Sequence, residues 1–233
     1  RDPEAVTAQA DCLAAQGDGV VVHFDARAPR PDRRRLATML AGRQGAGRKG
    51  IVLLERPRRC GWGDWSLVAA TLDAIRAALA SFPDATHLYL ISADCLPVRP
   101  ARAIRAALAE QDLDWIESED FFDSDWIRTG LRDERLIYRH PFNERRHPAL
   151  FNAALATQRA LGLRRGLPPG LRIRIGSQWW CLRRATAEAV LGLCAARPEI
   201  PRFFATTWIP DETFFQTLVR HLVPRREVTG RAP

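Results

Sequence analysis

The chain has 233 residues, of which 46% are hydrophobic and 27% charged, which is typical of a folded domain with a substantial core. No apolar run approaches the roughly 18 residues of a membrane-spanning helix, so the sequence predicts no membrane span. The net charge of +8 is compatible with a phosphorylated ligand, but Lys49 is the only lysine and the arginines are scattered. A nucleic-acid-binding protein would instead cluster its basic residues among exposed aromatic ones, so we expect no nucleic-acid partner.

The cysteines and histidines lack the spacing of disulfide frameworks and zinc sites. The number of cysteines is odd, and no two of them form a CxxC motif: Cys12, Cys60, Cys95, Cys181 and Cys194. This usage favours a reducing compartment. No histidine has a partner at the spacing of a zinc ligand pair.

The first half of the chain alternates between short apolar runs and amphipathic segments. Helices are predicted over residues 4–15, 33–40, 62–79 and 102–110, and strands over residues 20–25, 51–54, 86–92 and 114–117. This alternation predicts an α/β fold with a mostly parallel sheet flanked by helices. Because ligands bind at the carboxyl ends of such strands, we expect Asp25, Asp94 and Glu117 along one crevice.

The second half of the chain is less regular. Residues 121–146 are charged and aromatic, which predicts a long active-site loop or a strand pair. Further helices are predicted over residues 150–163 and 185–196, and a strand with a Gly-Ser break over residues 173–182. The glycines at positions 42, 45, 47 and 50 do not match a phosphate-binding motif and are interpreted as a surface loop.

The last predicted helix carries two acids at its start. Pro210 fits the first turn of a helix, and Asp211 and Glu212 follow at its positive end. The helix dipole favours the ionised form of Glu212, which a general base needs. Acids at a helix start are also common where they only stabilise that end. The stretch alone therefore leaves a structural and a catalytic interpretation open.

Aromatic residues near glycines provide candidate ligand surfaces. Trp62 and Trp65 flank a Gly-Asp pair, and Trp179 and Trp180 follow Gly176 and Ser177. Tryptophan is usually a core residue. Because neighbouring strand residues face opposite sides, one of Trp179 and Trp180 is expected to face a cleft, where its ring could support a sugar.

Five motifs in order carry a resemblance to a known family. They are WGDWS before a helix, SADCLP and WIE after strands, GSQWWCLRR, and PDETFFQTLVR. Together they resemble the core-2/I-branching β-1,6-N-acetylglucosaminyltransferases, which are glycosyltransferase family 14 and include the peptide O-xylosyltransferases. The resemblance covers roughly residues 20–222.

The resemblance implies a GT-A-like fold and an inverting, metal-independent transfer of a sugar, with N-acetylglucosamine favoured, from a UDP-sugar to an acceptor hydroxyl. Glu212 would be the general base. The other roles implied are nucleotide binding by His23, Asp25 and Asp94, and acceptor binding by Glu117, Trp179, Trp180 and Asp211. Arg220, Arg225 and Arg226 are the candidates for the diphosphate, because guanidinium groups can take the place of a metal ion.

A metal site is not expected, although Asp123-Ser124-Asp125 has the DxD pattern of metal-dependent glycosyltransferases. That pattern should directly follow a buried strand, whereas here it follows the acidic segment ESEDFF. The strand that ends at the corresponding place offers only Asp94, and a single carboxylate is a poor Mg²⁺ site. We therefore predict no metal cofactor.

Compared with the family pattern, the first strand would precede Arg1, and the usual diphosphate-binding residues would follow the last helix. We expect one glycosyltransferase domain over residues 1–233 that lacks its first strand and its C-terminal part. The composition indicates a bacterial enzyme of the cytoplasm or the membrane periphery. Two alternatives stay open: a UDP-xylose-dependent enzyme, and a non-catalytic nucleotide- or glycan-binding domain of the same fold.

Overall fold

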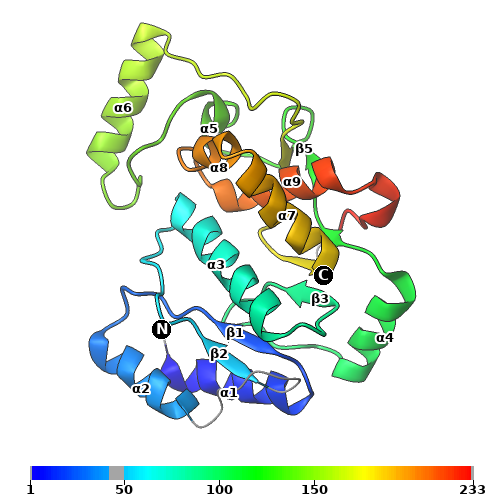
Figure 1. Cartoon of the computed structure of the whole chain (residues 1–233). Coiled ribbons are helices and arrows are strands. Elements are labelled where there is room, and N and C mark those ends of the chain that lie inside the picture. The colour runs from blue at the N-terminus through cyan, green and yellow to red at the C-terminus, as the bar shows by residue number, and fades with distance from the viewer. Residues whose placement is uncertain (1, 42–49, 232–233) are drawn as a thin grey trace.

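The computed structural model describes residues 2–41 and 50–231, and it has an α/β fold with several short sheets (Figure 1). The predicted loop glycines at 42, 45 and 47 lie outside the described residues. The N-terminal part contains two helices and a parallel pair of strands: α1 (Pro3–Ala15), β1 (Val20–Val22), α2 (Arg30–Ala41) and β2 (Ile51–Leu53). In this pair Val20 lies opposite Ile51, and a small core forms between the strands and the two helices.

A second sheet brings together strands from distant parts of the chain. Its strands and the neighbouring helices are α3 (Trp65–Ser81), β3 (His87–Tyr89), α4 (Ala101–Gln111), β4 (Trp115–Ile116) and β7 (Trp180–Arg183). The strand β7 lies between β3 and β4 and is antiparallel to both. Consequently β3 and β4 run in the same direction, and their carboxyl ends lie at the same edge.

The remaining elements surround this sheet. They are β5 (Glu119–Asp120) paired antiparallel with β6 (Arg174–Ile175), the helices α5 (Glu134–Ile137), α6 (Pro148–Leu161), α7 (Arg184–Ala196), α8 (Glu199–Phe204) and α9 (Phe214–Leu222), and the 3₁₀ turns η1 (Pro210–Glu212) and η2 (Arg225–Glu227). Figure 1 shows α6 at the edge of the molecule, between two long connections.

The predicted mostly parallel sheet is not what the structure contains: within the described ranges, β1 and β2 are the parallel neighbours, and the other strand pairs are antiparallel. The predicted strand 173–182 is split into β6 and β7. It breaks at Gly176, where a Cβ atom would lie only 2.2 Å from the Glu117 carbonyl oxygen. A short apolar run predicts burial, but it does not specify the neighbour or direction of a strand.

The main core lies between the second sheet and the helices α3, α7 and α9. Trp180 is 2% exposed there, with its ring centroid 5.1 Å from that of Phe215. Trp65 at the start of α3 packs edge to face on Phe214, the first residue of α9. Burial of these aromatic rings is worth a few kcal/mol each, so it fixes the start of α9 against the start of α3.

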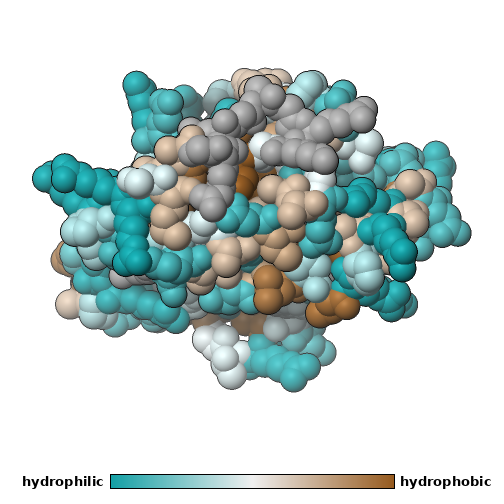
Figure 2. Space-filling view, turned by 90° about the horizontal axis from the view of Figure 1, so that it is seen from below, coloured by the Kyte–Doolittle hydropathy of each residue, from teal (hydrophilic) through white to brown (hydrophobic). Residues whose placement is uncertain are grey.

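The surface and the thiols agree with the composition. The face in Figure 2 is mainly hydrophilic, with small separate apolar patches. Among the described helices, none has both the length and the apolar character needed to cross a membrane. All five cysteines are free thiols.

Candidate active site

Glu212 is the last residue of the turn η1 and lies just before α9. The sequence predicts it in the first turn of that helix, but Thr213, with a φ of −128°, separates the turn from the helix. The Glu212 carbonyl accepts a hydrogen bond from Gly176 N–H at 3.0 Å. Its Oε2 accepts another from Arg135 Nη1, also at 3.0 Å. The carboxylate is 32% exposed, so a ligand can reach it.

Arg135 is a candidate site residue that sequence reasoning missed. It belongs to the short helix α5, its side chain is 9% exposed, and its Nε donates to the Leu131 carbonyl at 2.7 Å. The guanidinium is thus held from one side and presents a fixed positive charge to Glu212. No local pattern could reveal it, because the two residues are 77 positions apart in the chain.

A second, half-buried arginine joins the segments that carry this ion pair. Arg165 donates to the Leu136 carbonyl at the end of α5. Its other nitrogens donate to Phe203, Thr206 and Thr207, which lie at the end of α8 and in the following turn. Burial lowers the pKa of Arg165 to about 10. The hydrogen bonds from Arg165 to these neutral acceptors fix α5 relative to the segment that leads to η1.

Asp211 has a largely buried side chain, and one of its two carboxyl oxygens has no hydrogen-bond partner. Its Oδ1 is shielded from solvent and unpaired among the described residues. Burial, with smaller contributions from the charges of Glu212 and Asp64, raises the pKa of Asp211 to about 6. Because an unpaired buried carboxyl group is costly, Asp211 is a candidate to bind a polar group of a ligand.

The backbone before η1 is strained. Ile209 is β-branched and yet has a φ of +53°, which is rare for such residues. Its N–H donates to the Gly63 carbonyl at 3.0 Å, and its side chain is 7% exposed. Gly63 itself has a φ of +72°, and a Cβ atom there would lie 2.9 Å from the Trp208 ring. The loop before α3 and the segment before Glu212 are therefore interlocked. Strain of this kind is concentrated at functional sites.

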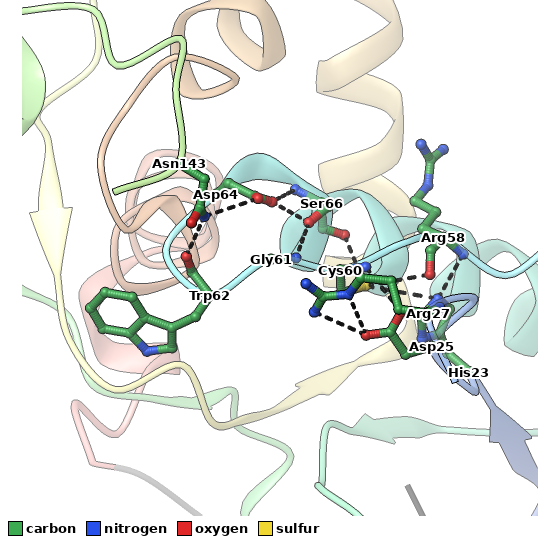
Figure 3. Close-up of polar contacts among 10 residues, drawn as sticks. All are labelled: His23, Asp25, Arg27, Arg58, Cys60, Gly61, Trp62, Asp64, Ser66 and Asn143. Atoms are coloured by element: carbon green, nitrogen blue, oxygen red, sulfur yellow. Dashed lines mark hydrogen bonds and ion pairs between the residues drawn. The ribbon is translucent and has the colours of Figure 1, made fainter. Parts of the chain in front are cut away.

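The loop before α3 is held by a compact set of polar contacts (Figure 3). Asp64 caps α3 by accepting from Ser66 N–H at 2.9 Å, and Gly61 N–H donates to Ser66 Oγ at 2.8 Å. Asn143 donates to the Trp62 carbonyl at 2.7 Å and to Asp64 at 3.2 Å. Trp62 is 44% exposed, and its ring meets that of Trp208 edge to face. An aromatic side chain is therefore exposed beside η1.

His23 and Asp25 follow β1 and meet the other end of the same loop (Figure 3). His23 Nε2 accepts from Arg58 N–H at 2.9 Å, so the proton of the neutral ring is on Nδ1; burial lowers the pKa of His23. Burial by itself would raise the pKa of Asp25, but hydrogen bonds from Arg27 and Cys60 N–H hold that pKa below its usual value. Asp25 also forms an ion pair with Arg27 at 3.1 Å.

A groove of about 700 Å³ adjoins His23 at the end of β2. It is lined by Val52, Leu53, Leu54, Glu55, Arg56, Arg58 and Asp73. Arg58 connects it to His23, because its backbone N–H donates to His23 while its side chain pairs with Asp73 at 2.5 Å. Residues 58–66 therefore run from this groove to the segment that carries Glu212, and the site has two ends on one continuous loop (Figure 3).

The comparisons identify the family. A family model described as core-2/I-branching enzyme matches residues 17–231. The chain belongs to the core-2/I-branching enzyme family. This confirms the resemblance predicted from the five motifs. The family is a glycosyltransferase family, so the protein is a glycosyltransferase, which needs a nucleotide-sugar donor and an acceptor. A search of curated protein sequences found no match.

Of the acceptor residues expected from the resemblance, Glu117 and Trp179 lie on segments that are close to Glu212. Glu117 follows β4 directly, and its carboxylate accepts from Ser177 N–H at 3.2 Å. Ser177 follows Gly176, whose N–H bonds the Glu212 carbonyl. Trp179 is partly exposed on the same segment, whereas Trp180 faces the core and is closed to a ligand. As predicted for neighbouring strand residues, the two rings face opposite sides, and that of Trp179 is the one open to a ligand.

Asp94 is separate from the other predicted nucleotide residues. It is exposed in the turn after β3, where its N–H donates to Ser92 Oγ at 3.3 Å. Gln9 of α1 holds this turn through the Ser92 carbonyl at 2.7 Å. Within the described part of the chain, Asp94 shares no hydrogen bond or ion pair with His23 or Asp25.

The predicted diphosphate arginines lie at the C-terminal end of α9. Arg220 is in its last turn, and Arg225 and Arg226 follow in η2, which is anchored to the start of β4. With a rise of about 1.5 Å per residue, Arg220 is roughly 12 Å along the helix from Glu212. Burial, with smaller contributions from Arg174 and Arg225, lowers the pKa of Arg220. Their role at the diphosphate stays a prediction.

The DxD segment has no metal-site geometry. Asp123 is 75% exposed and its carboxylate lies 3.4 Å from Arg172. Across residues 2–41 and 50–231, no three His, Cys, Asp or Glu side chains gather as metal ligands would.

Proposed function

We propose that this glycosyltransferase moves a sugar from a UDP-sugar to an acceptor hydroxyl with inversion and without a metal ion. Glu212 is the general base, and N-acetylglucosamine is the favoured sugar. The observation that carries the proposal is the Glu212 carboxylate itself: it is accessible, it is oriented by Arg135 at 3.0 Å, and it stands in the motif that resembles the family's base. A GT-A-like arrangement and a bacterial, cytoplasmic location belong to the same proposal.

The chemistry requires one in-line displacement. Glu212 takes the proton of the acceptor hydroxyl while the hydroxyl oxygen attacks the anomeric carbon. The bond between that carbon and the UDP oxygen breaks on the opposite face, so the configuration inverts. General-base assistance of this kind is worth about 10²–10⁴ in rate. Arg135 contributes by keeping the carboxylate oxygens at one position during the reaction.

The donor end is proposed at β1 and β2. His23 can donate from Nδ1 to a carbonyl of the uracil ring of the donor, because its Nε2 already accepts from the backbone. The groove beside it contains Arg56 and Arg58, whose guanidinium groups can balance the charge of a diphosphate. This assignment is an alternative to Arg220, Arg225 and Arg226.

The acceptor end is proposed around η1. The unpaired carboxyl group of Asp211 and the carboxylate of Glu117 are suitable acceptors for sugar hydroxyl groups. Trp179 and the exposed Trp62 offer aromatic surface on either side. The difference between N-acetylglucosamine and xylose as the transferred sugar depends on a pocket for the N-acetyl group, so a donor screen decides between them.

The test is the Glu212→Gln variant. Gln keeps an oxygen that can accept from Arg135 but cannot take a proton. We expect UDP release with UDP-N-acetylglucosamine and a panel of glycoside acceptors to fall by about 10²–10⁴. The affinity for UDP, measured by calorimetry, should stay within a few-fold of wild type, because the donor end is unchanged.

The matched control is Glu188→Gln, which changes a 50% exposed glutamate on α7. It should keep full activity. Turnover near the wild-type level in Glu212→Gln would remove Glu212 from the mechanism. Loss of UDP binding together with activity would instead indicate a misfolded site, which thermal denaturation would show.

A further inference from the structure

Arg145 lies over the ring of Trp62, an aromatic residue of the proposed acceptor end, and has no role in the steps described so far. We propose that it binds an acidic group of the acceptor, so that the acceptor is a sugar or glycoconjugate that carries a carboxylate, sulfate or phosphate near its reacting hydroxyl. This inference rests on the proposed function, because it identifies the class of acceptor that the same site takes.

Arg145 is an oriented cation without an anion. Its guanidinium carbon lies over the Trp62 ring, 3.7 Å from the ring centroid. Stacking uses the face of a guanidinium and leaves the N–H donors at its edge open. In the part of the chain that the structure describes, no carboxylate pairs with Arg145, not even that of its neighbour Glu144. A planar cation in this state matches the fork geometry of a carboxylate or phosphate.

The pair is held rigidly from two distant segments. Trp62 lies in the loop before α3, and Asn143, two residues before Arg145, donates to the Trp62 carbonyl at 2.7 Å. The ring centroids of Trp62 and Trp208 are 5.4 Å apart, and Trp208 itself is 5% exposed. A fixed guanidinium loses less entropy when it binds an anion than a mobile surface arginine does.

The position of the pair assigns it to the acceptor. Gly63, the residue after Trp62, accepts the hydrogen bond from Ile209, which lies three residues before the base. The proposed donor groove is at the other end of the loop, beside Arg58 and His23 (Figure 3). Because the base acts on the acceptor hydroxyl, a cation on this side meets the acceptor rather than the diphosphate.

The test compares two sugars that differ only in charge. Methyl β-D-glucuronoside and methyl β-D-glucoside are titrated by saturation-transfer NMR against the full chain and its Arg145→Gln variant. Wild type should bind the glucuronoside about five- to tenfold more tightly, and added salt should reduce this preference. In Arg145→Gln the preference should disappear while the weak binding of the glucoside stays.

The matched control is Arg146→Gln, because Arg146 is an exposed neighbour of equal charge with no ring beneath it. It should keep the preference, and Trp62→Phe, which retains an aromatic face, should keep part of it. Equal binding of the two sugars by wild type would overturn the proposal, as would an equal effect of the two arginine variants.

UDP titration of the same variants separates the two sources of negative charge. UDP affinity should be the same in wild type and Arg145→Gln. If Arg145→Gln weakens UDP and leaves the glucuronoside unaffected, Arg145 serves the donor diphosphate and the acceptor proposal is wrong. Binding of the sugars requires no turnover. A charge preference that depends on Arg145 would therefore support the subsite even if Glu212→Gln showed that the proposed base is incorrect.

Discussion

At the residue scale, Asp211 is the clearest departure from ordinary surface chemistry. A largely buried carboxyl group with an unpaired oxygen is most stable when it is neutral, and the neighbouring Glu212 adds repulsion to its ionised form. Its position beside Glu212 is therefore unfavourable for stability and suitable for binding a polar group of a ligand. The same argument yields a measurable dependence of stability on pH.

The sign of that dependence follows from the two pKa values. Asp211 holds its proton up to about pH 6 in the folded chain, whereas the unfolded chain releases it near 3.8. Between these values the folded state binds more protons, so its stabilising contribution is full below about pH 4 and is lost as the pH rises through 6. Asp211→Asn lacks this contribution. The stability of wild type relative to Asp211→Asn should fall by about 1–3 kcal/mol between pH 4 and pH 7.

Urea unfolding of both chains at each pH is the measurement, and Asp120→Asn is the control of opposite sign. Burial by itself would raise the pKa of Asp120, but the hydrogen bond from Arg172 holds that pKa below its usual value. Its contribution is therefore present at neutral pH and is lost on acidification below about pH 4. A constant difference between wild type and Asp211→Asn across the range would show that Asp211 is not buried as an unpaired carboxyl group.

At the element scale, the site depends on the contact between the loop before α3 and the turn η1. The Gly63 carbonyl holds Ile209 in its unfavourable conformation, and Gly63 leaves just enough room for the Trp208 ring. Helix capping by Asp64 and the packing of Trp65 on Phe214 then join the two helices that follow. These four contacts together fix the position of η1, which carries Glu212, against the start of α3.

Gly63→Ala tests this contact. An alanine at a φ of +72° costs about 1 kcal/mol, and its Cβ would lie 2.9 Å from Trp208, which should add about 1–3 kcal/mol. Urea unfolding should therefore show a loss of about 2–4 kcal/mol, and turnover should fall because Ile209 and Glu212 shift.

Gly162→Ala is the control, since Gly162 has a φ of +64° and open space around the position of its Cβ. It should show only the backbone cost of about 1 kcal/mol and normal turnover. Equal effects of the two alanines on stability and turnover would mean that the clash with Trp208 does not occur.

At the scale of the whole molecule, α3 lies between the β1–β2 layer and the larger core (Figure 1). It contacts β1 on one side and α7 and η1 on the other. The loop that leads into α3 therefore connects the proposed donor end on the first layer with the proposed catalytic and acceptor end on the second. A net charge of +8 gives the whole chain a favourable field for anionic substrates.

This arrangement predicts a reaction that needs no metal ion. The proposed donor groove contains Arg56 and Arg58, of which Arg58 is paired with Asp73, and the carboxylate of Asp123 is close to Arg172. We expect UDP affinity in calorimetry, and turnover in the UDP-release assay, to be unchanged by excess chelator. Activity that disappears in chelator and returns with Mn²⁺ would contradict this prediction, and loss of that response in Asp125→Asn would identify the DxD segment as the ligand.

Much of the local structure could be predicted from the sequence. The helices near residues 4–15, 102–110 and 185–196 are confirmed within a few positions, because the helical spacing of apolar residues depends only on residues close together in the chain. The direction of the sheet was not predictable, since β7 reaches its place between β3 and β4 only when the entire second half folds onto the first. The short helix α8 was also missed, because six residues show too little periodicity.

The amino-acid sequence alone determined the α/β class, the family and the position of Glu212, because motifs and periodicity are local properties of the chain. Only the tertiary structure decided that Arg135 pairs with Glu212, that Asp211 Oδ1 is buried without a partner, and that Trp180 belongs to the core. It also placed Arg220, Arg225 and Arg226 at the end of α9 that is remote from Glu212. The physical reason is the same in each case: burial, charge and reach depend on residues that are distant in the chain and meet only through packing.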